Sequence, residues 1–139
     1  MHAQQLLLKQ IEETGNMLVR AIDGVSEAGL DHRVHPTMMS IREHLAHLCE
    51  AYVGFEASAR GAKHEWGTYQ PAETTKEALM QQFSELRARA ITTIVGSDEE
   101  AILISGAGYI ANHDAYHIGQ IAATRQAFDP EWSSYSLYA

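Results

Sequence analysis

The sequence predicts an all-α protein whose fold is an antiparallel four-helix bundle, with a long crossover loop between its first and second helices. Four segments repeat apolar residues at steps of three and four, which is the period of an amphipathic helix. No segment sustains the alternation of apolar and polar residues that marks a half-buried strand. Four such helices, each with one apolar face, pack best as a bundle.

The first helix has an apolar stripe that ends near two glycines, Gly24 and Gly29. Its stripe consists of Leu7, Ile11, Thr14, Leu18, Ile22 and Val25. The segment 26–39 that follows is long for a tight hairpin. We therefore expect it to cross over the end of the bundle.

The second helix is predicted from Ser40 to about residue 60, because Ser40 and Glu43 form a capping box and Gly61 follows the apolar pattern. Its stripe consists of Ile41, Leu45, Leu48, Tyr52 and Phe55. The side that carries His47 also carries Ala51, Gly54 and Ser58, whose small side chains leave room for a neighbouring helix or a cavity.

The third and fourth helices follow the same logic. The third begins at Thr74, with Glu77 as its capping partner, and stops at Gly96. Its stripe consists of Leu79, Phe83, Leu86, Ala90 and Ile94. A short turn is expected at 97–100, and the fourth helix is predicted over about 107–128.

Composition narrows the class of protein. A chain of 139 residues with 45% hydrophobic residues suits a single domain over residues 1–139. The net charge of −8 argues against nucleic acid and anionic membrane surfaces as partners. The single cysteine, Cys49, cannot form an intrachain disulfide, and no segment resembles a signal peptide or a membrane span. We expect a cytoplasmic protein with Cys49 as a small buried hydrophobe.

Two of the eight histidines, His113 and His117, lie four residues apart and share the predicted face of the fourth helix. Two imidazoles on one buried face need several hydrogen-bonding partners, and a shared metal ion satisfies one nitrogen of each. A hydrogen-bonded pair in the core is the alternative. Spacing alone does not separate these two interpretations.

A metal site would need a third ligand, for which the second helix offers His44 and His47. His44 is nearer to the centre of the apolar stripe, whereas His47 shares its side with the small residues, so periodicity leaves both open. The loop histidines His32, His35 and His64 are expected to be solvated.

Two motifs resemble the signatures of the DinB-like (DinB/YfiT) family. SIREHLAHLCEAY, residues 40–52, resembles the family's Ser-[Ile/Val]-x-x-Leu-Leu-x-His motif, and HDAYHIGQI, residues 113–121, resembles His-x-x-x-His-x-Gly-Gln-[Ile/Leu]. The resemblance implies a DinB/YfiT-like four-helix bundle with a metal bound by His47, His113 and His117. His44 stands where the family usually has an apolar residue, and Met39 stands where it often has Trp.

The resemblance also implies a function. Three histidine ligands leave open positions on a divalent ion, with Zn²⁺ or Ni²⁺ favoured and Fe²⁺, Co²⁺ or Mn²⁺ as alternatives. Family members of known activity are metal-dependent transferases or isomerases that use low-molecular-weight thiols such as bacillithiol, mycothiol or glutathione, and dimers are expected. An enzyme of this kind would have metal-dependent thiol S-transferase or hydrolase-like activity; the alternative is a non-catalytic metal-binding or stress-response homodimer. No catalytic residue is predicted, and Arg42, Arg87, Arg89 and Arg125 are scattered candidates for binding a thiol's carboxylates.

The sequence also predicts roles for residues in and around the second motif and for the C-terminal segment. Asp114 is expected to be solvated, with a hydrogen bond to a ligand as the alternative; Gly119 is expected to permit close helix packing, and Gln120 to reach a ligand histidine. Four tyrosines are expected to pack against the bundle, and one or two of them are expected at a pocket rim. They are Tyr109, Tyr116, Tyr135 and Tyr138. The C-terminal WSSYSLYA has no clear pattern and is expected to dock on the bundle or on a partner subunit.

Overall fold

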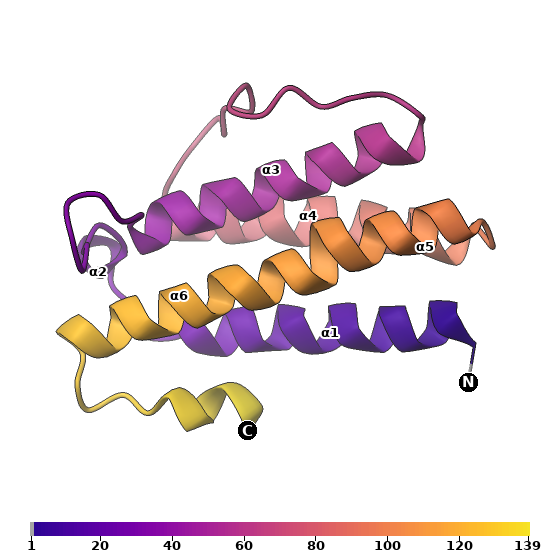
Figure 1. Ribbon diagram of the computed structural model, residues 1–139. Helices are drawn as coiled ribbons and strands as arrows, with labels where there is room; N and C mark the ends of the chain where they lie inside the picture. The colour runs from indigo at the N-terminus through magenta and orange to yellow at the C-terminus, as the bar shows by residue number, and fades with distance from the viewer. Residues whose placement is uncertain (1) are drawn as a thin grey trace.

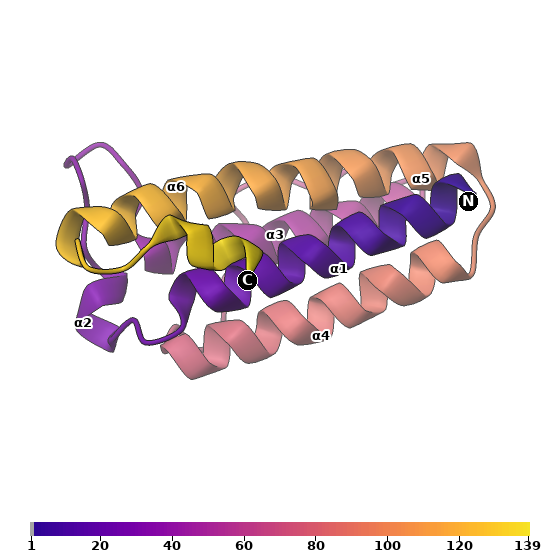
Figure 2. The same ribbon diagram turned by 90° about the horizontal axis from the view of Figure 1, so that it is seen from below.

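The computed structural model describes residues 2–139, and this part of the chain is all-helical, without a β-strand. The elements are α1 (Ala3–Ile22), α2 (Glu27–Leu30), α3 (Ile41–Ala59), α4 (Lys76–Val95), α5 (Glu100–Gly106), the π-helix η1 (Ala107–Asn112), α6 (His113–Phe128) and the 3₁₀ helix η2 (Ser134–Tyr138). Elements α5, η1 and α6 follow one another without a break and form one long segment that lies beside α1, α3 and α4 (Figures 1 and 2). The fourth predicted helix therefore begins earlier than expected, at Glu100.

The direction of the helices differs from the predicted antiparallel arrangement. The amide of Gln4, at the start of α1, donates to the carbonyl of Ile94 at 2.8 Å, so α1 begins where α4 ends. The guanidinium of Arg42, at the start of α3, donates to the carbonyl of Thr74, just before α4. Helices α3 and α4 therefore run in the same direction, and α1 runs opposite to α4.

Two long connections join the four long helical segments. Segment 60–75, between α3 and α4, passes back along the length of the molecule, whereas the α1–α3 connection stays at one end (Figure 1). Segment 26–39 joins α1 to α3 at one end of the bundle, and these two helices lie on opposite sides of it, with α4 and α6 between them (Figure 2). The segment contains the short helix α2, which Ser26 caps by accepting a hydrogen bond from the Gly29 amide at 3.0 Å.

The core is formed by the predicted stripes. Side chains from α1, α3, α4, η1 and α6 are fully buried, among them Ile11, Leu18, Leu45, Phe55, Leu79, Ile94, Ile110 and Ile121. Val25 is also buried, although it lies beyond the end of α1. The predicted capping box of Ser40 and Glu43 is present. The cap of α4 is Thr75 instead of Thr74, because the Thr75 hydroxyl accepts from the Ala78 amide.

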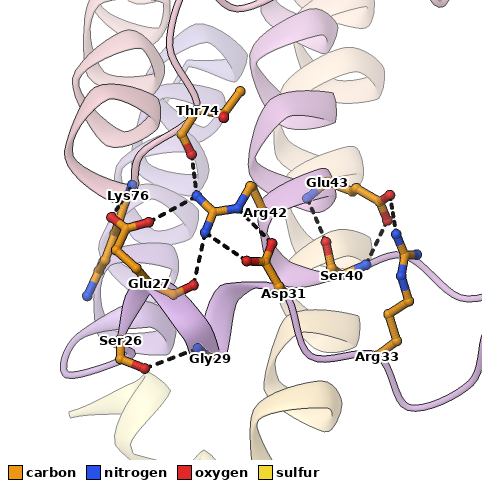
Figure 3. Close-up of polar contacts among 10 residues, drawn as sticks. All are labelled: Ser26, Glu27, Gly29, Asp31, Arg33, Ser40, Arg42, Glu43, Thr74 and Lys76. Carbon is orange, nitrogen blue, oxygen red and sulfur yellow. Dashed lines mark hydrogen bonds and ion pairs between the residues drawn. The ribbon is translucent and has the colours of Figure 1, made fainter.

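Arg42 joins three elements at one end of the molecule (Figure 3). Its guanidinium donates to the carboxylates of Asp31 and Glu27, at 2.8 and 3.0 Å, and to the carbonyls of Glu27 and Thr74. Glu27 in turn accepts from the Lys76 amide at 2.7 Å. The network therefore connects α2, α3 and the start of α4, and it gives Arg42 a structural role.

The C-terminal segment docks on α1, as one of the two expected outcomes. Leu137 of η2 is buried, and Arg20 of α1 donates to its carbonyl at 2.8 Å. The guanidinium of Arg125 lies over the Trp132 ring, 4.6 Å from its centroid.

None of the described helices is long and apolar enough to cross a membrane.

Candidate metal centre

Two neighbouring helices supply four histidines to one place in the core. Helix α3 carries His44 and His47, one turn apart, and α6 begins at His113 and carries His117 one turn later. The π-helix η1 comes directly before His113. Such wide turns occur often at functional sites, where the extra residue re-aims the side chains that follow.

Three imidazole nitrogens converge within this cluster. The Nε2 atom of His113 lies 3.1 Å from Nε2 of His47 and 3.1 Å from Nε2 of His117. One atom of each of the three residues lies within 4.8 Å of the other two, so the group could hold a metal ion. Periodicity left His44 and His47 open as third ligand, the family resemblance implied His47, and the structure brings His47 to the other two.

The spacing fits a divalent ion better than it fits hydrogen bonds. Nitrogens bound about 2.0–2.1 Å from one ion, at angles near 90–110°, lie about 2.9–3.4 Å apart. An imidazole nitrogen carries either a proton or a lone pair, so Nε2 of His113 cannot donate to one neighbour and accept from the other. An ion would instead use the lone pairs of all three nitrogens.

His44 lies behind the three nitrogens and contacts one of these residues. Its Nδ1 atom is 2.8 Å from Nδ1 of His117, and its side chain is buried. If Nε2 of His117 presents its lone pair to an ion, its Nδ1 carries the proton and donates it to His44. With a metal bound, His44 would therefore hold His117 in the tautomer and orientation that metal binding requires.

A cavity of about 580 Å³ opens beside the cluster. We call it the metal-facing pocket, and it is lined by His47, Trp66, Ile104, Ser105, Gly108, Tyr109 and His113. Trp66 and Tyr109 stack nearly parallel, with an interplanar angle of 9°. A metal at the three nitrogens would therefore have its free positions next to a partly aromatic pocket.

The comparison with protein families agrees with this geometry. The family model described as the DinB superfamily matches residues 10–121, which include all four histidines of the cluster. The chain belongs to the DinB superfamily. Searches of curated proteins and of solved structures gave no match.

Burial lowers the pKa of three histidines in the cluster of this DinB-superfamily protein. Desolvation lowers the pKa of His44 to about 4, that of His113 to about 4 and that of His117 to about 3, and charge on neighbouring histidines adds to each effect. Neutral imidazole is the form that binds metals. His113 and His117 can therefore present lone pairs to a cation near neutral pH.

Asp114, next to the first histidine of the family motif, is buried, so the expectation of a solvated side chain was wrong. Its Oδ2 atom accepts from the Tyr52 hydroxyl at 2.9 Å and from the Thr14 hydroxyl at 3.0 Å. Burial raises the pKa of Asp114 to about 7, although these two hydrogen bonds oppose the increase. Asp114 thus ties α6 to α1 and α3 and orients the helix that carries His113.

The segment after α3 is held against the pocket by Glu50. This buried carboxylate accepts from His64 Nε2 at 2.8 Å and from the Gly67 amide at 2.6 Å. Burial alone would raise the pKa of Glu50, but these hydrogen bonds lower it overall. His64 was expected to be solvated, but its side chain is largely buried against Glu50. Trp66 lies in the chain between His64 and Gly67, and its ring is placed beside that of His47, with ring centroids 5.7 Å apart.

The small residues beside His47 have the predicted effect. A side chain at Gly54 would meet both Trp66 and Tyr109 at 3.3 Å, and the Ser58 hydroxyl lies 3.0 Å from that of Ser105. Glycine at position 54 therefore lets these two rings approach α3 closely. Trp66 was missed by sequence reasoning, because nothing in a loop sequence indicates which core site the loop covers.

Other expectations for this DinB-superfamily chain have mixed outcomes. Cys49 is buried as predicted, and burial raises its pKa to about 12. Gly119 was expected to permit close packing, but a Cβ atom there would meet open space. The side chain of Gln120 makes no hydrogen bond to a histidine within residues 2–139. Tyr109 lines the pocket as expected, whereas three other tyrosines are exposed instead of packed: Tyr116, Tyr135 and Tyr138.

Proposed function

We propose that this protein binds one divalent metal ion through Nε2 of His47, His113 and His117, and that it acts as a metal-dependent transferase with a low-molecular-weight thiol. The observation that carries the proposal is the convergence of these nitrogens beside the metal-facing pocket, where Nε2 of His113 lies 3.1 Å from Nε2 of each of the other two. Zn²⁺ and Ni²⁺ suit the ligand set best, with Fe²⁺, Co²⁺ and Mn²⁺ as alternatives.

A bound ion would supply a positive charge and an open position that favour the thiolate form of a thiol at neutral pH. The protein's own residues would do the rest. His44 keeps the His117 ring in position, Trp66 and Tyr109 form an aromatic wall of the pocket, and the pocket holds the reactants together. The transfer itself would form a carbon–sulfur bond while a leaving group departs from the carbon of the second substrate.

Three further features belong to the same proposal. We propose one domain over residues 1–139, a homodimer as the working assembly, and a cytoplasmic location. The exposed apolar side chains on the surface, such as Val19 and Tyr116, are consistent with a contact between copies of the chain.

The test measures bound metal by mass spectrometry in the untagged protein and in three variants, His47→Ala, His113→Ala and His117→Ala. We expect about one ion per wild-type chain, as in three-histidine sites, and less than a tenth of that in each variant. His35→Ala is the matched control, because His35 is an exposed loop histidine. Full metal content in His47→Ala, or none in the wild type after reconstitution, would contradict the proposed centre.

Turnover is tested separately, by following the loss of free thiol in the presence of an alkylating electrophile. We expect a rate above that of the uncatalysed reaction with the metal-loaded protein, and no acceleration with His113→Ala. Stoichiometric metal without turnover, for every thiol tried, would contradict the transferase and favour the non-catalytic metal-binding alternative.

A further inference from the structure

The metal-facing pocket also indicates which kind of molecule it takes. Apart from its two histidines, its lining consists of Trp66, Ile104, Ser105, Gly108 and Tyr109. None of these described lining residues carries a charge, and three of them are large and apolar or aromatic. The volume, about 580 Å³, is in the range of pockets for drug-sized ligands.

Three of the four arginines considered as carboxylate-binding candidates make contacts elsewhere in the protein. Arg42 is held in its network at the far end of α3, Arg87 donates to the Ile11 carbonyl, and Arg125 donates to the Ala21 carbonyl at 2.8 Å. Arg89 does not line the pocket. A ligand carboxylate in the pocket would therefore lose hydration without gaining a cationic partner, apart from the metal itself.

The aromatic wall is fixed in place before any ligand arrives. Trp66 and Tyr109 stack on each other with centroids 6.1 Å apart, and both rest against Gly54. Trp66 is anchored from the loop side by the hydrogen bonds of Glu50 to His64 and to the Gly67 amide. A ring held in this way offers a flat surface for stacking at little cost in conformational entropy.

We propose that the metal-facing pocket selects a neutral, aromatic or apolar ligand body that carries a single metal-binding donor atom. This inference rests on the proposed function, because the donor atom is held by the metal at His47, His113 and His117. The body of the ligand contacts Trp66, Tyr109 and Ile104, and the Ser105 hydroxyl is the polar group available to it. Ligands with an additional charge on the body are disfavoured.

Two thiols that differ by one charge test this selectivity. The Co²⁺-loaded protein is titrated with thiophenol and with 4-mercaptobenzenesulfonate, and thiolate binding is followed through the visible spectrum of the cobalt. We expect thiophenol to bind at least about tenfold more tightly, because the sulfonate would be desolvated against uncharged side chains. Equal affinities, or tighter binding of the sulfonate, would overturn the inference.

Substitution of Trp66 in the aromatic wall provides a second test of the inference. Trp66→Ala is expected to weaken thiophenol binding by roughly fivefold to tenfold, the range typical of one aromatic contact, while 2-mercaptoethanol changes by less than about twofold. Tyr135→Ala is the matched control, because this tyrosine is 83% exposed and does not line the pocket. An unchanged thiophenol affinity in Trp66→Ala would also overturn the inference.

The two proposals fail in different ways. Absence of cobalt binding to the wild-type protein would overturn the metal centre and the ligand inference with it. Cobalt that binds and is lost in His113→Ala, but accepts both aromatic thiols equally, would overturn the ligand inference alone.

Discussion

At the scale of single residues, His44 differs most from what its family predicts. The DinB-like motif usually has an apolar residue at this position, and an apolar side chain would leave Nδ1 of His117 without its partner at 2.8 Å. Partners of this kind fix ligand orientation, and their loss typically costs 10- to 100-fold in metal affinity. If the three nitrogens hold a metal ion as proposed, His44 would tune its affinity through a contact that the motif alone does not include.

His44→Leu is expected to lower metal affinity by about tenfold, because the proton on Nδ1 of His117 loses its acceptor. His44→Asn should recover part of the affinity, since its amide oxygen can accept from about the same position. Affinity is measured by competition with a chelator, and circular dichroism checks that the helices are intact. Equal affinity in the wild type and His44→Leu would show that His44 only fills space.

At the scale of elements, α3 combines three roles along one helix. Its N-terminus carries the capping box and Arg42, its first two turns carry His44 and His47, and Gly54, two turns beyond His47, is where Trp66 and Tyr109 rest. The position of α3 therefore decides the position of the metal centre. The polar network at its start, shown in Figure 3, is what ties α3 to α2 and α4.

Arg42→Ala is expected to lower the free energy of unfolding by about 1–2 kcal/mol, because the carbonyls of Glu27 and Thr74 lose a charged donor. Arg33→Ala is the matched control: Arg33 pairs with Glu43 at the surface, where ion pairs contribute little. Urea denaturation of both variants gives the comparison. A loss in Arg33→Ala as large as that in Arg42→Ala would show that the network has no special role.

At the scale of the whole molecule, the buried titratable groups make stability depend on pH. The pKa values of His44, His113 and His117 are lowered from 6.5 to about 4, 4 and 3, so between these values and 6.5 the unfolded chain binds more protons than the folded one. These three groups therefore destabilise the fold as pH falls below 6.5. Asp114 acts in the opposite direction, because its raised pKa of about 7 makes the folded state bind more protons above 3.8.

Three destabilising groups outweigh one stabilising group, so the metal-free protein should become less stable as pH falls from about 6.5 to about 4. Urea midpoints of the chelator-treated protein at several pH values measure this change. His44→Asn should flatten the dependence, since one of the three groups is removed. Stability that increases toward acid would mean that Asp114 dominates the balance.

The sequence by itself determined the helical class, the buried stripes and the candidate histidines. These follow from local periodicity, from capping chemistry and from the two motifs, and each of these signals lies within a few turns of one helix. His113 and His117 were visible as a pair because four residues make one helical turn. Their assignment as partners of His47 needed the family resemblance.

Only the tertiary structure decided how the helices run and what surrounds the cluster. The crossover at 60–75, the stacking of Trp66 on Tyr109 and the burial of Asp114 against Thr14 and Tyr52 all join residues far apart in the chain. Periodicity shows which face of a helix is apolar, but it does not show which element covers that face. The contacts that define the pocket and position His44 arise from packing between elements, so no single stretch of sequence contains them.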